Sequence, residues 1–454
     1  MREFAASGGK LRRRRGVVAA CVAAVAAVSG LVIAVSAGTR APSAAAKEAS
    51  TARAMFADAL PPATIKARQH YFGLDNVDPR TGAVRSDRVI LSWAGVSTFA
   101  AAFNGHVVLL DAWIPRGPST TWNHSAEYVG TTPQELAALA PEAYFIGHFH
   151  GDHGYDAPAI VEANPDMAVY GNQNHCDDLR AQVRERDPRL QVNCFAVFPS
   201  VEIENGRPVP SSFGMVDNLP PNTVPGVRIS AVIHPHSLRP DDPEADPPFN
   251  TMQVTKRPCV AFDQYPPDPN EPERPPSPPS GIIAIAWQFR IGDFALTWSD
   301  SNGPDVGART AQAWASLPPT DVYFGAIAVS GRSVLNEGLA QIRPKVYAPI
   351  HHDPCANDVY REVRDQLATI PAASRPQLLY LSDPADYLKP IVFDPSAEAL
   401  KANGVSESGP RPPAPATATM TPAAPAPAPA PAAAAPAAPA DTVLSVPVTK
   451  STAR

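Results

Sequence analysis

Short apolar runs that end in polar or glycine-containing turns recur along the chain, and most of them predict β-strands. Two β-rich runs within residues 88–113 are separated by Asn104-Gly105, the dipeptide that most strongly predicts a tight hairpin. Residues 281–300 predict two more strands, joined by a turn at Gly292-Asp293. Further strands are expected at 143–147, 167–171, 227–234, 321–329, 345–350 and 377–381.

Segments with helical spacing lie between several of these strands. Thr132 is the expected N-cap of a helix within 131–141, with Pro133 in its first turn and Glu135 completing a capping box. Further helices are expected near 177–185, 308–317 and 355–370. Strands that alternate with helices but also form hairpins predict mixed sheets flanked by helices, not an all-parallel Rossmann sheet.

The N-terminal region has the pattern of an export signal. Arg12–Arg15 precede an apolar run from Gly16 to about Gly38, and Val35-Ser36-Ala37 is the expected cleavage site. Residues 1–37 are therefore expected to be an export signal, with an uncleaved membrane anchor as the alternative. Both interpretations predict a secreted or cell-envelope protein outside the cytoplasm.

Composition divides the rest of the chain. Residues 38–67 are Ala-rich and predict a linker or a short helix, and residues 68–400 predict a folded domain. A Pro-rich acidic insertion at 237–280 interrupts that domain. Residues 401–454 are dominated by alanine and proline, which cannot bury a core, and predict a disordered tail. We expect any association with a membrane or cell wall to involve the N-terminal segment and this tail.

Charge and cysteine content narrow the classes of partner and compartment. A net charge of −6 provides no basic surface for nucleic acid, so a nucleic-acid partner is not expected. Four cysteines follow the signal, an even number in a chain expected to reach an oxidising compartment. We prefer the pairs Cys176–Cys194 and Cys259–Cys355 among the three connectivities, and four free thiols are the alternative.

Candidate chemistry concentrates in "YFIGHFHGDHGYD" at 144–156. His148 and His150 are two residues apart on an extended segment, so their side chains point the same way and can reach one cation. Asp152 and His153 follow in a loop and can serve a second cation. Other candidate ligands follow later β-like runs, namely His234, His236, Asp300, His351 and His352. This distribution predicts a site assembled at one edge of packed sheets.

Taken together, these motifs resemble the metallo-β-lactamase superfamily over roughly residues 70–395. The stretches "AYFIGHFHGDH", "FALTWSD" and "KVYAPIHH" are most similar to its branch of ascorbate-6-phosphate lactonase-like and phospholipase D-like hydrolases. The resemblance implies a four-layer αββα sandwich of two mixed β-sheets flanked by helices. Two features depart from the family pattern: Ser299 stands where glycine usually precedes the aspartate, and the insertion after His236 is atypical.

The same resemblance implies a ligand set for two ions. One ion would be held by His148, His150 and His236, with His236 preferred to His234. The other would be held by Asp152, His153 and His351, with His351 preferred to His352 because it directly follows Pro349-Ile350. Asp300 would bridge the two ions, and Asp152 is also the expected catalytic residue. Residues expected to support the ligands or to contact substrate are Asp111, His175, His234 and His352.

This ligand set predicts two divalent cations, with Zn²⁺ preferred and Mn²⁺ or Fe as alternatives. Two such ions can generate a hydroxide between them near neutral pH and polarise a carbonyl or phosphoryl oxygen. The expected function is an exported hydrolase of an ester-type bond, such as a lactone or phosphodiester, in a small-molecule or lipid-like substrate. The alternatives are an iron-dependent redox enzyme or oxygenase of the same fold and a non-catalytic, metal-stabilised envelope protein.

Overall fold

The computed structural model describes residues 59–115, 129–204, 207–209, 214–236, 278–301, 308–327, 334–336, 338–352, 359–381 and 383–396. All of them belong to a compact unit that begins at Ala59. The expected export signal and tail, and most of the expected insertion, lie outside the described residues. Within the described ranges, no helix is long and apolar enough to cross a membrane.

The first β-sheet has seven strands within the described residues. Its order is β16 (Ile391–Phe393), β1 (Val89–Trp93), β2 (Phe99–Phe103), β3 (His106–Leu110), β4 (Ala143–Phe145), β5 (Ala168–Asn172) and β6 (Cys194–Phe198). Strands β16 to β3 are antiparallel and strands β3 to β6 are parallel. Asn104 and Gly105, with φ of 53° and 85°, form the tight turn between β2 and β3, so the predicted hairpin is confirmed.

The second sheet also has seven strands in the described part of the chain. Its order is β15 (Gln377–Leu378), β14 (Val346–Ile350), β13 (Val322–Ala326), β12 (Phe294–Ser299), β11 (Ile283–Ile291), β10 (Arg228–Pro235) and β9 (Gly214–Val216). Strands β9 to β12 are antiparallel and β12 to β15 are parallel. A small hairpin, β7 (Ile203–Glu204) and β8 (Arg207–Pro208), stands apart from both sheets. Mixed pairing in both sheets confirms the predicted sheet type.

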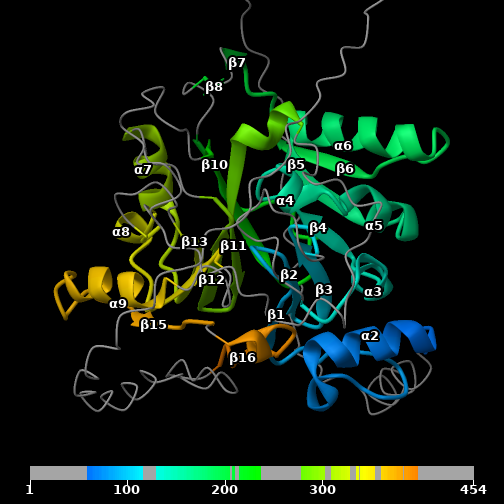
Figure 1. Ribbon diagram of the computed structural model, residues 1–454, viewed down its shortest axis with the longest axis horizontal. Helices are drawn as coiled ribbons and strands as arrows, with labels where there is room; N and C mark the ends of the chain where they lie inside the picture. The colour runs from blue at the N-terminus through cyan, green and yellow to red at the C-terminus, as the bar shows by residue number, and fades with distance from the viewer. Residues whose placement is uncertain are drawn as a thin grey trace, which may run out of the picture. The chain divides into compact units, whose positions relative to one another are not determined.

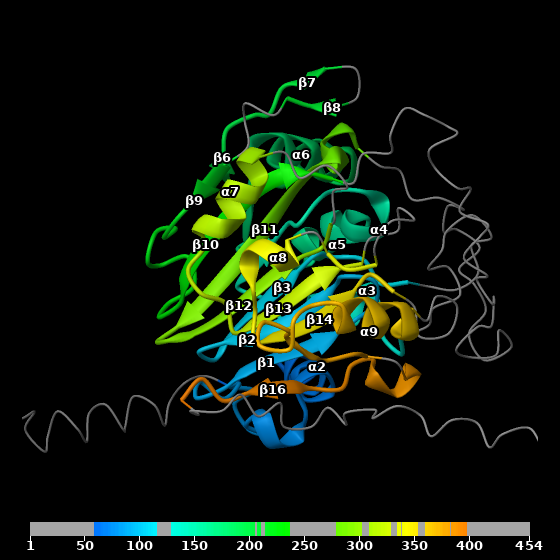
Figure 2. The same cartoon turned by 90° about the vertical axis from the view of Figure 1, so that its left-hand side faces the viewer.

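Helices cover the outer face of each sheet (Figure 1). The first sheet is flanked by α3 (Pro133–Ala138), α5 (Ala157–Ala163) and α6 (Gln173–Arg186), and the second by α7 (Ala308–Ser316), α8 (Leu339–Ile342) and α9 (Tyr360–Ala368). Figure 2 shows α7, α8 and α9 in front of the second sheet. Shorter elements are α4 (Gly151–Gly154), η1 (Leu74–Asn76), η4 (Pro279–Ile282) and η5 (Pro384–Asp386). The predicted four-layer αββα sandwich is therefore confirmed.

Helix α2 (Pro62–Phe72) packs against β1 and α3. It starts inside the segment expected to be a linker, so the folded unit begins before the expected boundary at residue 68. The guanidinium of Arg68 explains this early start. It donates to the carbonyls of Leu139, Gly82 and Ala140 at 3.0, 3.0 and 3.3 Å, and so fastens α2 to the domain.

The main core lies between the two sheets. Phe103 of β2 stacks on Phe289 of β11 with ring centroids 4.5 Å apart. The Trp287 ring is fully buried, with its centroid 5.1 Å from that of Phe145, and its indole N–H donates to the Ile146 carbonyl at 2.9 Å. These aromatic contacts fix β4 of one sheet against β11 of the other. The chain after β4 is therefore held beside the second sheet.

The disulfide predicted between Cys176 and Cys194 is present and joins α6 to β6. Its partners are 18 residues apart in the sequence. The other expected pair, Cys259 and Cys355, lies outside the described residues.

Candidate metal centre

Two adjacent strands of the first sheet and three of the second end at a common edge. Asp111 follows β3 and His148 follows β4. His236, Asp300 and His351 follow β10, β12 and β14, which all run in the same direction. Their positions after strands predicted the convergence of the histidines and Asp300, the resemblance added Asp111, and the structure brings these residues together.

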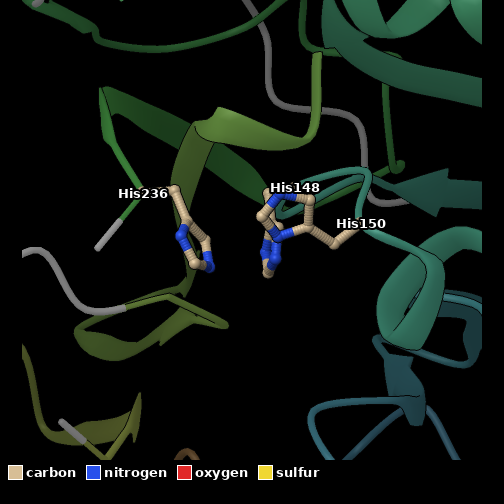
Figure 3. Close-up of side chains that lie close together, drawn as sticks. All are labelled: His148, His150 and His236. Atoms are coloured by element: carbon tan, nitrogen blue, oxygen red, sulfur yellow. The ribbon is translucent and has the colours of Figure 1, made fainter. Parts of the chain in front are cut away.

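His148, His150 and His236 form the first cluster, here called site A. One ring nitrogen from each lies within 4.8 Å of the others. The His236 ring is centred 4.4 Å from that of His148 and 4.5 Å from that of His150. Figure 3 shows the His236 ring on one side, facing the rings of His148 and His150.

Asp152, His153 and His351 form the second cluster, here called site B. The Nε2 atoms of His153 and His351 are 3.1 Å apart, and Oδ2 of Asp152 is 3.7 and 3.8 Å from them. A point equidistant from these three atoms lies about 2.1 Å from each, the length of a bond from Zn²⁺ to nitrogen or oxygen. Site B thus has the spacing that a bound cation requires.

Asp300 lies between the two sites. Its Oδ2 accepts a hydrogen bond from the His148 backbone N–H at 2.7 Å, and it lies 2.6 Å from His148 Nδ1 and 3.3 Å from His153 Nδ1. Its Oδ1 and the Nε2 of His148 are buried without a hydrogen-bond partner among the described residues. Buried polar atoms in proteins are normally paired, so these two atoms suit a cation.

Two residues around Asp300 explain how it fits. A Cβ on Gly147 would overlap the Asp300 carboxylate, so glycine is required for this close approach. Ser299, the departure from the family pattern, is buried and donates its hydroxyl to the Ser301 carbonyl at 3.0 Å. The serine side chain is thus accommodated while Asp300 keeps its contact with His148.

Burial sets the protonation of the site A imidazoles. It lowers the pKa of His148 to about 4 and that of His150 to about 3. Both rings are therefore neutral at neutral pH, which is the form that binds metal. Burial opposes ionisation of Asp300, but the charge and hydrogen bonds of His148 and His153 outweigh it and hold the pKa of this carboxyl well below its usual value.

Asp111 contacts His153 of site B at Nδ1, the ring nitrogen that is turned away from the site. Its Oδ2 lies 2.7 Å from His153 Nδ1 and accepts from the Ser97 hydroxyl at 2.8 Å, and its Oδ1 accepts from the Gly147 N–H at 3.1 Å. The bond to Nδ1 leaves His153 Nε2 directed at site B, which is how outer partners orient metal-binding histidines. The structure thus places Asp111, a residue expected to support the ligands, against His153. Burial and the charge of Asp300 raise the pKa of Asp111 well above its usual value.

Ser97 was missed by sequence reasoning. Its hydroxyl lies 2.7 Å from His153 Nδ1 in addition to its bond to Asp111. The neighbouring Val96 has a φ of 47°, and its carbonyl accepts from the backbone N–H of His351 at 2.9 Å. His351 itself has a φ of 67°. Non-glycine residues in this left-handed region concentrate at functional sites, but no motif in the sequence marks the loop.

The alternative histidines lie elsewhere. His234 points away from site A, with its ring 5.1 Å from that of Trp314 and its Nδ1 2.9 Å from the Pro235 carbonyl. His352 bonds the Leu381 carbonyl at 2.7 Å and stacks on Tyr380. The structure thus brings His236 and His351 to the clusters, in line with the preferences drawn from the sequence.

His175 is held by backbone atoms. It is buried in the first turn of α6, and its Nε2 donates to the carbonyls of Ile283 and Ser280 at 3.0 and 3.3 Å. The side chain of Asn172 caps the helix by accepting from the His175 N–H at 2.9 Å. His175 therefore joins α6 to η4 and the start of β11.

No protein-family model and no curated protein matches the chain. Among solved structures, the metallo-hydrolase Igni18 of Ignicoccus hospitalis is 14% identical with a TM-score of 0.39, covering 65% of this chain and 96% of that chain. The diiron β-hydroxylase CmlA of Streptomyces venezuelae is 10% identical with a TM-score of 0.36, and the match covers 68% of this chain and 55% of that chain. Zn²⁺-bound PqqB of Methylobacterium extorquens is 11% identical with a TM-score of 0.32, and the match covers 62% of this chain and 84% of that chain.

The chain's own sheet order, its helical layers and the edge at which its motifs meet define the fold. In the described part of the chain, two mixed sheets pack face to face between helices, with the histidine and aspartate motifs following β4, β10, β12 and β14. The described residues therefore form the four-layer αββα sandwich that the resemblance to the metallo-β-lactamase superfamily implies.

Proposed function

We propose that the protein is a dinuclear metal-dependent hydrolase that cleaves an ester-type bond in a small-molecule or lipid-like substrate. The observation that carries this proposal is the convergence of sites A and B on Asp300. A closed structural metal site normally uses four ligands and favours thiolates. The seven histidine and aspartate side chains of this edge exceed that need, and they form two neighbouring clusters.

Each site has a defined set of residues in this proposal. His148, His150 and His236 would hold one ion, Asp152, His153 and His351 would hold the other, and Asp300 lies between the two clusters. Imidazole and carboxylate ligands suit Zn²⁺, with Mn²⁺ or Fe as alternatives. When bound, two such cations supply a nucleophile derived from water and a positive charge that polarises the scissile carbonyl or phosphoryl group.

The protein's own groups supply orientation and proton transfer. Asp111 and Ser97 hold Nδ1 of His153, so that its Nε2 is directed at site B. Asp152 reaches site B from the first turn of α4. Its side chain is 9% exposed, so a water molecule from solvent can contact the carboxylate. We assign to Asp152 the role of orienting that water and accepting its proton.

We also propose that the protein acts outside the cytoplasm. The disulfide between Cys176 and Cys194 supports this, because structural disulfides persist mainly in oxidising compartments. The pattern of residues 1–37 agrees with export. Fractionation of cells that express the full chain, together with the N-terminal sequence of the mature protein, tests the location and the cleavage.

Metal content and turnover test the hydrolase proposal. Protein purified without added metal is expected to hold two zinc ions per chain and to hydrolyse members of a panel of lactones and phosphodiesters. His351→Ala and His236→Ala should each remove one ion and most of the activity. The matched variants His352→Ala and His234→Ala should keep both ions, because those rings face away from the sites.

The contrary outcomes are distinct. Iron in place of zinc, with oxygen consumption and no hydrolysis, would identify a redox enzyme of the same fold. Two bound ions without turnover on any ester would identify a metal-stabilised envelope protein. Unchanged activity in both His351→Ala and His236→Ala would refute the dinuclear mechanism.

A further inference from the structure

The short helix η4 lies directly against site A. A Cβ on Gly281 would overlap the His150 ring, so the backbone of η4 packs on that ring. The next residue, Ile282, accepts the backbone N–H of His236 at 2.9 Å. Two of the three site A histidines are therefore placed by consecutive residues of one short segment.

Helix α6 holds η4 through two polar side chains. His175 Nε2 donates to the carbonyls of Ser280 and Ile283, which flank Gly281 and Ile282 in the sequence. Asp178, one helical turn further on, accepts the backbone N–H of Ser280 at 3.1 Å. The two side chains thus fix both ends of the segment that contacts His150 and His236.

Site B has separate supports. His153 is oriented by Asp111 and Ser97, and the backbone of His351 is bonded to Val96 of the loop between β1 and β2. None of these contacts involves α6 or η4. A change at α6 should therefore act on one site and leave the other unaffected.

Resting on the proposed two-metal function, we propose that His175 and Asp178 are positioning residues for site A, acting through η4. Neither side chain binds metal in this arrangement. They hold the carbonyls and the N–H that set the path of Gly281 and Ile282. Those two residues in turn set the angle of the His150 ring and the position of His236.

Zinc affinity measured one site at a time tests the proposal. The full-length His351→Ala variant retains site A, and His236→Ala retains site B. In the first background, His175→Phe keeps an aromatic ring but removes the N–H donor. Zn²⁺ affinity should then fall roughly ten- to a hundredfold, as for other outer partners of metal ligands. In the second background, the same substitution should leave Zn²⁺ affinity unchanged. Affinity is read from competition with a chromophoric chelator.

Three further variants separate positioning from a general loss of stability. His175→Gln restores a donor and should recover part of the site A affinity. Leu179→Ala opens a cavity on the buried face of α6 and should lower the melting temperature without altering either affinity. Asp178→Ala should weaken site A, whereas Asp177→Ala, at the neighbouring exposed position, should not.

Should His175→Phe not fold, the Asp178→Ala and Asp177→Ala pair tests the same positioning role. Equal losses at both sites, or no loss at site A, would overturn that role. Failure of the unmutated chain to bind two zinc ions would instead refute the proposed dinuclear function. The two failures are therefore distinguishable.

Discussion

Gly147→Ala is the sharpest single test of the site geometry. Gly147 immediately precedes His148, and its Cα faces the Asp300 carboxylate so closely that an added Cβ would overlap the Cγ and both oxygens. The φ of Gly147 is not in the left-handed region, so alanine can adopt the backbone. The substitution therefore acts only through the space it takes from Asp300.

The size of the effect follows from what must move. Asp300 is fully buried, so its carboxylate cannot swing into solvent. Overpacking a buried site costs about 1–3 kcal/mol. Displacement of Oδ2 also weakens its 2.7 Å bond from the His148 N–H, and a hydrogen bond to a charged group contributes about 1.5–3 kcal/mol. We expect the free energy of unfolding of the metal-free protein to fall by about 2.5–6 kcal/mol in total.

Denaturant unfolding with a chelator present measures this loss, and zinc titration measures the effect on both sites. Because Asp300 contacts both clusters, Zn²⁺ affinity should fall at A and B together. Gly214→Ala is the matched control, since nothing lies within 4 Å of its added Cβ. It should be neutral or slightly stabilising. Wild-type stability and two unchanged zinc affinities in Gly147→Ala would show that Asp300 does not occupy the position described.

Three further predictions concern the support of His153, the Cys176–Cys194 disulfide and the effect of bound metal on stability. Asp111→Asn would place an amide N–H against His153 Nδ1 and force the ring proton onto Nε2. Zn²⁺ affinity at site B should therefore fall roughly ten- to a hundredfold in a single-site titration. Zn²⁺ affinity at site A should be unchanged. Reduction of Cys176–Cys194, which closes a loop of 18 residues, should lower the free energy of unfolding by about 3 kcal/mol in denaturant titrations; an unchanged midpoint after complete reduction would contradict this. Removal of metal by a chelator should lower the melting temperature, because each ion present at a hundred times its Kd stabilises the folded protein by about 2.7 kcal/mol. Added Zn²⁺ should restore the melting temperature. A melting temperature insensitive to chelation would argue against metal bound at these sites.

Local patterns in the sequence predicted the mixed sheets and the strand-end motifs, and the resemblance to the metallo-β-lactamase superfamily implied the four-layer sandwich. Asn104-Gly105 predicts a hairpin from two residues alone. The apolar run before His148 predicts a strand that ends near His148, whichever strands lie beside it in the sheet. The contacts of Ser97 could not be predicted in this way. They arise because Val96 adopts a positive φ and brings a loop between β1 and β2 under His153. That contact spans 56 residues and has no local signature.

The choice between His234 and His236 shows where periodicity stops being informative. Residues two apart on a regular strand point to the same side, so alternation alone would place both rings together. Strand β10 ends at Pro235, however, and His236 leaves the strand to bond with Ile282 at the end of η4. His234 consequently faces Trp314 under α7, while His236 faces His148. The point at which β10 ends decides which of the two rings joins site A, and η4, held by α6, positions the chain beyond that point. The positions of the candidate ligands thus depend on tertiary structure, whereas the sequence shows only which residues are candidates.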